Sequence, residues 1–315
     1  MIIVHAKGNE EIGIGNLSRC FELIIYLSKR NEVIGIFECD EKLFERYKIS
    51  NIIKSNSLAF SLKIIEKYKS VIYICDLIDA NKQLSLELRK LSIKKILFFN
   101  DIKYGFEPNI LFLTDGFDYP FQAKGVDVYR GFEYYIVGQN IIKNRKKNFK
   151  PITSLKNILI CFGGADPAFY TEYFVKIIND NKNNYTIILG PAMNDNRKKY
   201  IKSIKKDNIT YVDSPKNMVE LLLSSDLLIT LGGMITYEAM CLGIPACAVR
   251  WKYLEYIVKS FGEKQMVNDL GDINDAYQNM LDLNIQDLNK ISENAYNIID
   301  GSALRNIEKV IENNL

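Results

Sequence analysis

A glycine pair between a strand pattern and a helix pattern carries the clearest chemical signal in the chain. Gly232 and Gly233 lie in the segment Leu231–Pro245, directly after an apolar run. The helical pattern Met234–Leu242 follows at once, so bare backbone N–H groups and the helix dipole favour a phosphate there. Glu238, one turn into this helix, is placed to bind ribose hydroxyls. The alternative is a tight turn with a solvated glutamate, because short glycine motifs are weak signals.

A second glycine pair, Gly163 and Gly164, also follows a predicted strand, Asn157–Cys161. Glycine at such a junction lets a phosphate approach the backbone closely. The next residues, Asp166 and Pro167, predict a helix with aspartate as its N-cap and proline at its first position. We therefore expect a second phosphate-facing junction in this half of the chain.

The first helix pattern, Gly15–Arg30, begins in a glycine-bearing loop. Gly13 and Gly15 let a substrate approach the backbone, and Asn16 lies at the expected helix N-terminus. Asn16 either contacts a substrate or serves only as an N-cap, a position that asparagine favours for structural reasons alone. The sequence leaves both interpretations open.

Acidic residues follow a third predicted strand, Val71–Cys75. Asp76 ends this strand and Asp79 lies close behind it. A carboxylate at the end of a strand can accept a proton during catalysis. The structural alternative is that Asp76 caps the helix that follows.

Composition limits the classes of function. The chain has 315 residues, 48% hydrophobic and 25% charged, which is typical of a globular protein. Its net charge of +3 does not indicate a nucleic-acid partner. A basic run between Lys143 and Lys150 contains one aromatic residue, Phe149, but no aromatic platform for stacking successive bases, so we interpret it as a solvated linker.

Cysteine and histidine usage argues against a disulfide framework and a metal site. The six cysteines form no CxxC pair, and His5 is the only histidine. We expect the cysteines to be buried free thiols in a reducing cytosol, so we predict a cytoplasmic protein. No apolar run reaches the roughly 18 residues of a membrane span, and the N-terminus does not resemble a signal peptide. The cysteines are Cys20, Cys39, Cys75, Cys161, Cys241 and Cys247.

Strand and helix patterns alternate twice along the chain, which predicts two α/β domains with parallel sheets, each Rossmann-like. We expect an N-terminal domain over residues 1–142, a linker over 143–151, and a nucleotide-binding domain with C-terminal helices over 152–315. Ligands of such sheets bind at the carboxyl ends of the strands, so we expect both domains to face a central cleft. The polar linker is the expected hinge for closure around a ligand.

Three segments together resemble a known family. IGIGNLSR (12–19) is similar to an IGxGHxxR motif, FGGADP (162–167) to FGGSDP, and LGGMITYEAMCLGIP (231–245) to GGxTxYExxxLGxP. These motifs occur in the nucleotide-sugar hydrolases of the pseudaminic-acid pathway, which are related to spore-coat polysaccharide proteins and to peptidoglycan N-acetylglucosaminyltransferases. The resemblance spans roughly residues 1–270. It implies the glycosyltransferase-B fold, with a uridine nucleotide held by the C-terminal domain.

We also expect Met234 and Thr236, which lie in the same segment, to belong to the nucleotide-sugar site. The departures concern catalysis. The histidine that is the family's presumed base corresponds to Asn16, which has no usable pKa. Ile78 replaces a tyrosine, and an Asn-Gln pair is replaced near Trp251 and Lys252. Arg250 and Lys252 either face a diphosphate or an acidic sugar, or are ordinary surface residues.

Two functions remain open at this point. The first is an enzyme of surface-glycan or nonulosonic-acid synthesis that transfers a sugar from a nucleotide sugar or hydrolyses it. Its base would then come from Asp76, Asp79, Asp101, Glu10 or Glu11. The second is a non-catalytic nucleotide-sugar binder that partners an active enzyme. We expect no cofactor and no metal, a nucleotide sugar as ligand, and a sugar or glycan as a further partner.

Overall fold

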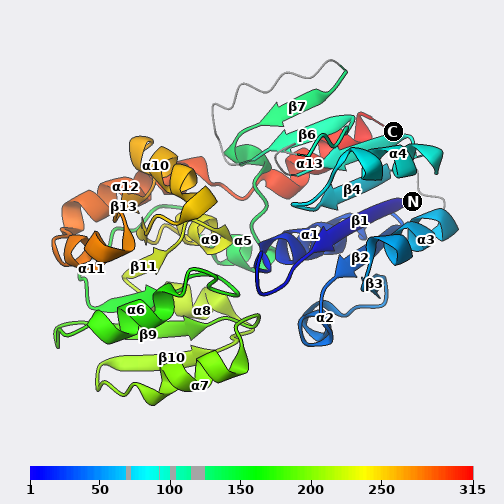
Figure 1. Cartoon of the computed structure of the whole chain (residues 1–315). Helices are drawn as coiled ribbons and strands as arrows, with labels where there is room; N and C mark the ends of the chain where they lie inside the picture. Colours follow the sequence, from blue (N-terminus) through cyan, green and yellow to red (C-terminus); the bar gives the residue numbers. More distant parts are fainter. Residues whose placement is uncertain (69–71, 92, 100–103, 115–124, 315) are drawn as a thin grey trace. The chain divides into compact units, whose positions relative to one another are not determined.

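The apolar runs of the sequence form parallel strands, and the amphipathic segments between them form helices (Figure 1). The computed structural model describes residues 1–68, 72–91, 93–99, 104–114 and 125–314. The chain divides into two units, each with its own sheet. Residues 1–9, 16–136 and 301–315 make the first unit, and residues 10–15 and 137–300 make the second.

Within the described residues, the first unit holds a seven-stranded parallel sheet in the order β3-β2-β1-β4-β5-β6-β7. The strands are β1 (Ile2–Lys7), β2 (Val33–Glu38), β3 (Ile52–Ser55), β4 (Ile72–Asp76), β5 (Lys95–Phe98), β6 (Ile110–Leu113) and β7 (Asp127–Arg130). The helices are α1 (Gly15–Leu27), α2 (Glu41–Tyr47), α3 (Leu58–Tyr68), α4 (Lys82–Lys90), the 3₁₀ helix η1 (Phe132–Tyr134) and α13 (Ala303–Glu312). Because the order reverses at β1, the crevice between β1 and β4 is the expected ligand position of this sheet.

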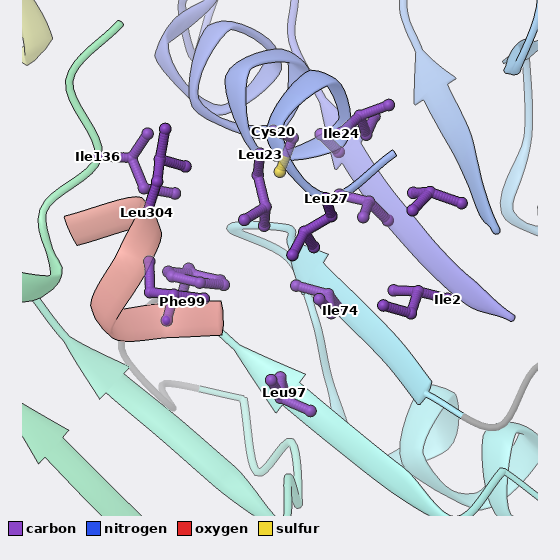
Figure 2. Close-up of a cluster of buried hydrophobic side chains, with 14 of the residues drawn as sticks. Ile2, Cys20, Leu23, Ile24, Leu27, Ile74, Leu97, Phe99, Ile136 and Leu304 are labelled. Carbon is purple, nitrogen blue, oxygen red and sulfur yellow. The ribbon is translucent and has the colours of Figure 1, made fainter. Parts of the chain in front are cut away.

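The pleat of β1 sends alternate side chains to opposite faces. Val4 and Ala6 pack with α1, α2 and α13, whereas Ile3 packs with α3 and α4. Each face carries its own apolar cluster, so the sheet is buried on both sides, as parallel sheets generally are. Figure 2 shows the cluster on the α1 side.

The last helix belongs to the first unit, not to the expected C-terminal domain. Leu304 and Ile307 of α13 lie in the same cluster as Phe99 and Ile136, and Figure 2 shows Leu304 beside these two. The helix is strongly amphipathic, so burial of its apolar face against this core explains the correction. The expected boundary at residue 315 is therefore wrong, and the second unit ends at Asp300.

The second unit holds a six-stranded parallel sheet in the order β10-β9-β8-β11-β12-β13. Its strands are β8 (Asn157–Ile160), β9 (Asn184–Leu189), β10 (Ile209–Asp213), β11 (Leu227–Thr230), β12 (Ala246–Ala248) and β13 (Asn268–Asp269). Its helices are α5 (Gln139–Asn144), α6 (Tyr170–Ile177), α7 (Asp195–Ser203), α8 (Met218–Leu223), α9 (Met234–Leu242), η2 (Lys252–Leu254), α10 (Glu255–Glu263), α11 (Ile273–Leu281) and α12 (Ile285–Ile298). The strand order reverses between β8 and β11, which places the expected ligand crevice there.

Part of the basic run is packed, which corrects its interpretation as a solvated linker. The guanidinium of Arg145 donates to the carbonyl oxygens of Cys241 (2.5 Å), Tyr296 (2.8 Å) and Ile299 (3.2 Å). It also lies 3.4 Å from the centre of the Tyr296 ring. These carbonyls belong to the C-terminal ends of α9 and α12, where backbone acceptors lack helical partners. Arg145 therefore fixes this segment to the second unit.

Among the residues that the structure describes, no helix is both long enough and apolar enough to cross a membrane.

Candidate functional site

The two glycine pairs of the second unit lie at one edge of its sheet. Gly163 and Gly164 follow β8, and Gly232 and Gly233 follow β11. These strands are hydrogen-bonded neighbours, with Ile160 opposite Ile229. Both pairs therefore reach the carboxyl edge at the point where the strand order reverses, the usual ligand position in such sheets.

Glycine is required at this edge for two different reasons. Gly232 has φ +86°, a left-handed conformation that a side chain disfavours. A Cβ atom on Gly190, in the loop after β9, would lie 2.2 Å from the carbonyl oxygen of Gly164. The loop after β9 therefore packs directly against the backbone of the Gly163-Gly164 loop.

Residues 10–15 belong to the second unit as well. A Cβ atom on Gly164 would lie 2.5 Å from Cγ1 of Ile14, so this segment also packs directly against the glycine loop.

Helix α9 begins without a side-chain cap. Gly233 is its N-cap residue and supplies no side chain, and no acidic residue lies in the first turn. The helix is buried on nearly all sides, and Met234 and Glu238 are its two partly exposed residues. They stand four residues apart and so share one face. The accessible face of α9 thus combines uncapped N–H donors with a carboxylate one turn away, as the sequence predicted.

Thr236 adds a buried polar atom to this turn. Its side chain is fully buried, and its hydroxyl has no hydrogen-bond partner within the described residues. A buried hydroxyl without a partner is unusual in folded proteins, because losing its water costs free energy. Thr236 stands two residues from both Met234 and Glu238, so it lies on the opposite, covered side of the helix.

The Asp166 segment differs from the expected helix cap. Asp166 has φ +46°, and its carboxylate accepts from the N–H groups of Tyr170 (3.1 Å) and Thr171 (2.9 Å). Helix α6 therefore begins at Tyr170. The expectation that Pro167 is its first residue is wrong. Burial raises the pKa of Asp166 to about 6, against the opposing effect of Arg197. Asp166 is a structural cap of the loop that carries the Gly163-Gly164 pair.

Arg197, which the sequence did not single out, holds this loop in place. Its guanidinium donates to Asp166 Oδ2 at 2.6 Å and to the Asp166 carbonyl at 2.7 Å. It also pairs with Glu172, and the exposed ring of Phe169 lies 4.1 Å from the guanidinium carbon. No spacing in the sequence links Arg197 to the glycine motif, because the contact depends on the packing of α7 against α6.

Arg250 is engaged within its own unit. Its Nη2 donates to Asp269 Oδ2 at 2.7 Å, and its Nε lies 3.0 Å from the same oxygen. The carboxylate of Asp269 therefore neutralises the guanidinium of Arg250, which the sequence had suggested as a partner for a diphosphate. Lys252, two residues on, is exposed and lies 5.1 Å from the Trp251 ring.

In the first unit, the structure brings Asn16 and Asp76 together through Arg19. The Arg19 guanidinium donates to Asp76 Oδ2 at 2.8 and 3.0 Å and to Asn16 Oδ1 at 3.1 Å. Asp76 is 1% exposed. Asn16 is the second residue of α1, which begins at Gly15, so the N-cap interpretation is wrong. Its Nδ2 is buried and has no partner among the described residues.

The other acidic candidates are placed less favourably. Asn81, not Asp76, caps the following helix α4. Asp79 is exposed and pairs with Lys7. Glu10 and Glu11 are exposed, and Asp101 lies outside the described residues. Gly13 has φ +79° and lies in the loop before α1.

In the part of the chain that the structure describes, no cluster of three or more His, Cys, Asp or Glu side chains has an arrangement that can hold a metal ion. All six cysteines are free thiols. Burial raises the pKa of Cys161 to about 12 and that of Cys241 to about 11, so neither presents a thiolate at neutral pH.

The two parallel-sheet units define the fold as that of the glycosyltransferase-B class, and this confirms the predicted fold class. Over 99–100% of the chain, the structure matches MurG of Acinetobacter baumannii (TM-score 0.63, 14% identity, 99% of that chain) and MnaA of S. aureus, solved with UDP (TM-score 0.70, 13% identity, 97% of that chain). At these identities the similarity concerns the fold.

No family model matches the sequence. An uncharacterized protein of Methanocaldococcus jannaschii is 29% identical over 266 residues, which are 78% of this chain and 54% of that protein. The chain thus spans about half the length of this relative. The spore coat polysaccharide biosynthesis protein SpsG of Bacillus subtilis is 22% identical over 281 residues, 85% of this chain and 83% of that protein.

Proposed function

We propose that the protein is a nucleotide-sugar enzyme of polysaccharide or surface-glycan synthesis that binds a uridine diphosphate sugar in its second unit. The observation that carries the proposal is the uncapped N-terminus of α9, with Glu238 one turn along its accessible face. The UDP complex of the structurally similar MnaA and the relationship to SpsG support the same ligand class.

The chemistry follows from the charges of such a ligand. A diphosphate carries its negative charge to the start of α9, where N–H groups and the helix dipole stabilise it, and the same groups stabilise a departing nucleoside diphosphate. Glu238 accepts hydrogen bonds from the ribose, and the loop at Gly163-Gly164 gives the ligand a second stretch of close backbone.

Between the two reactions, we favour transfer to a sugar hydroxyl over hydrolysis by water. Hydrolysis by the mechanism of the resembling family uses a histidine base at the position of Asn16, which cannot accept a proton. Transfer also releases a proton, from the acceptor hydroxyl, and the departing diphosphate oxygen is available to take it. Asp76 is buried and already paired with Arg19. The same observation supports a second candidate, a nucleotide-sugar binder without catalysis that partners an active enzyme.

Binding is tested by calorimetry with UDP. Glu238→Ala should weaken affinity by about 1–3 kcal/mol, the usual range for a hydrogen bond to a charged group. Glu293→Ala, at an exposed glutamate of α12, is the matched control and should leave affinity unchanged. Unchanged affinity in a folded Glu238→Ala protein would remove the ribose role.

Reaction type is tested by nucleotide release from a panel of UDP-, GDP- and CMP-sugars, with and without sugar acceptors. We expect slow or absent release without an acceptor. Asn16→His should bring little gain, although acid–base groups contribute roughly 10²–10⁴-fold in rate where they act. Rapid hydrolysis by the unaltered protein that persists in Asp76→Asn would contradict the preference for transfer.

A further inference from the structure

The first unit contains a second candidate site, a cavity of about 450 Å³ that is distinct from the Arg19–Asp76 pair. This volume lies within the roughly 300–1,000 Å³ of small-molecule sites. Residues after β1, β2, β3 and β4 line it, together with the starts of α3 and α4. Its wall includes Glu38, Asp40, Asp79, Lys7, Ser57 and Asn81.

The sheet itself separates this cavity from Asp76. Successive side chains of a strand alternate between faces, so His5 shares the face of Ile3, and Ala6 the opposite one. Ile3 packs with α3 and α4, whereas Ala6 belongs to the cluster with α1. The same alternation places Asp76 opposite to its neighbour Cys75, which packs with α3 and α4. The cavity and the Arg19–Asp76 pair therefore belong to opposite faces of one sheet edge.

A buried hydrogen-bond chain positions Glu38 in the cavity wall. His5 is fully buried, with Nδ1 2.6 Å from the Tyr73 hydroxyl and Nε2 2.9 Å from Glu38 Oε1. Ser61 donates to the same oxygen at 2.8 Å. Burial holds the pKa of Tyr73 well above its usual range, so its hydroxyl stays protonated. Nε2 of His5 donates to the carboxylate of Glu38.

Glu38 is left with one oxygen for a ligand. Both donors bond Oε1, and Oε2 has no hydrogen-bond partner within the described residues. Burial raises the pKa of Glu38, but the hydrogen bonds from His5 and Ser61 outweigh this effect and the net pKa is lowered. The side chain is 12% exposed. Glu38 is therefore a fixed, ionised acceptor at the surface of the cavity.

The remaining groups exclude an anionic ligand. The first turns of both helices are already capped, because Phe60 N–H donates to Ser57 Oγ at 3.2 Å and Leu84 N–H donates to Asn81 Oδ1 at 3.1 Å. Lys7 lines the cavity but is paired with Asp79. Three carboxylates in the wall then face a single ammonium group, so the cavity favours a cationic or donor-rich molecule.

We propose that this cavity binds an amino sugar, with the protonated amine of the ligand donating to Glu38 and its hydroxyls meeting the polar wall. A carboxylate accepts from an ammonium more strongly than from a neutral hydroxyl. The proposal does not depend on nucleotide binding in the second unit, and it adds Glu38, His5 and Tyr73 to the residues with a role in ligand binding.

The test is a titration of the whole protein with glucosamine, in the absence of nucleotide. His5 is the only histidine, so its ring signals in ¹H–¹⁵N NMR report the hydrogen bond to Glu38 without ambiguity. We expect saturable shifts of these signals. We expect weaker binding of N-acetylglucosamine, which lacks the charge, and no binding of glucose 6-phosphate.

Two variants and one control decide the role of the carboxylates. Glu38→Gln should weaken glucosamine binding about tenfold or more, as expected for a lost hydrogen bond between charged groups. Asp79→Asn, at an exposed residue that the fold tolerates, should weaken it several-fold because Lys7 loses its partner. Glu45→Gln on α2 makes the same charge change at an exposed pair and should have no effect.

Unchanged glucosamine affinity in Asp79→Asn and in folded Glu38→Gln would overturn the proposal, as would tighter binding of glucose 6-phosphate than of glucosamine. UDP affinity, measured separately on the same variants, should not change. A protein that binds glucosamine but not UDP would therefore contradict the proposed function and leave this inference intact.

Discussion

At the carboxyl edge of the first sheet, β4 ends in Asp76, whose charge is matched by the guanidinium of Arg19. At the corresponding edge of the second sheet, β11 is followed by Gly232 and Gly233 and by a helix without a side-chain cap. The first edge is occupied by charged groups that satisfy one another. At the second, a helix begins without a side-chain cap. Within the described residues, each edge also holds one buried polar atom without a hydrogen-bond partner, Asn16 Nδ2 at the first and Thr236 Oγ1 at the second.

The difference between these two edges shows how two similar parallel sheets can form different kinds of site. A bare helix N-terminus attracts an anion without any side chain, and its geometry is fixed by the helix. A buried ion pair contributes little net stability, but it holds both side chains in one arrangement. The second unit is thus suited to bind a diphosphate, and Arg19 keeps Asn16 and Asp76 in fixed positions.

The largest expected effect comes from breaking the pair at the first edge. Arg19→Met leaves Asp76 as a buried charge without its partner, so the free energy of unfolding should fall by about 3–5 kcal/mol. Urea denaturation at pH 7 measures the loss. Arg89→Met, which breaks an exposed pair with Glu107, is the control and should cost less than about 1 kcal/mol.

An equal loss in the two variants would show that the Arg19–Asp76 pair is solvated, and the contrast between the two edges would disappear. The double variant Arg19→Met, Asp76→Leu should recover most of the stability, because it removes the buried charge together with its partner.

A smaller effect is expected at the opposite end of α9, where the second unit does use a guanidinium. Arg145→Ala removes a donor shared by three carbonyl oxygens, so the unfolding free energy should fall by about 2–3 kcal/mol. Lys147→Ala, in the same basic run but exposed, should have no measurable effect. Similar values for the two variants would restore the interpretation of this run as a solvated linker.

The smallest effect concerns an ion pair at the edge of the second sheet. Burial raises the pKa of Asp213, but hydrogen bonds from Lys198 and Lys202 outweigh it and the net pKa falls well below the ordinary value of 3.8. The stabilisation is therefore complete well above the ordinary pKa of 3.8 and is lost gradually as the pH falls from there through the lowered folded-state pKa. Because the carboxylate is 38% exposed, solvent screens the pair, and Asp213→Asn should cost less than about 1 kcal/mol at pH 7.

Urea denaturation of both proteins at pH 7 and near pH 2 measures this difference, which should be smaller at the lower pH. A difference that grows on acidification would contradict the direction of the pKa shift.

Much of the fold was predictable because its strands are apolar runs with helical patterns between them. The segment Met234–Leu242 is helix α9 with the predicted bounds, and the glycine pairs lie where strand ends were expected. The placement of Arg19 and Asp76 side by side was not predicted, although both residues were noted, because it depends on β1 and β4 being neighbours.

The failures share a cause. The pairing of His5 with Glu38 joins adjacent strands, and the contact of Arg145 with Tyr296 joins segments about 150 residues apart. Local patterns report burial and element type, but they contain no information on which distant segments meet. The prediction that Asp166 is the N-cap of a helix beginning at Pro167 failed for a different reason. The φ of +46° at Asp166 is set by the loop and by the contact with Arg197 rather than by local preference.

The position of α13 affects the order in which the chain can fold as it is made. Domains generally fold from the N-terminus during synthesis. Here the core of the first unit includes Leu304 and Ile307, so it cannot be completed until these residues of α13 have left the ribosome. The second unit, whose last residue is Asp300, has all of its strands and helices earlier. Of the two units, the one that is begun first is therefore the one that is completed second.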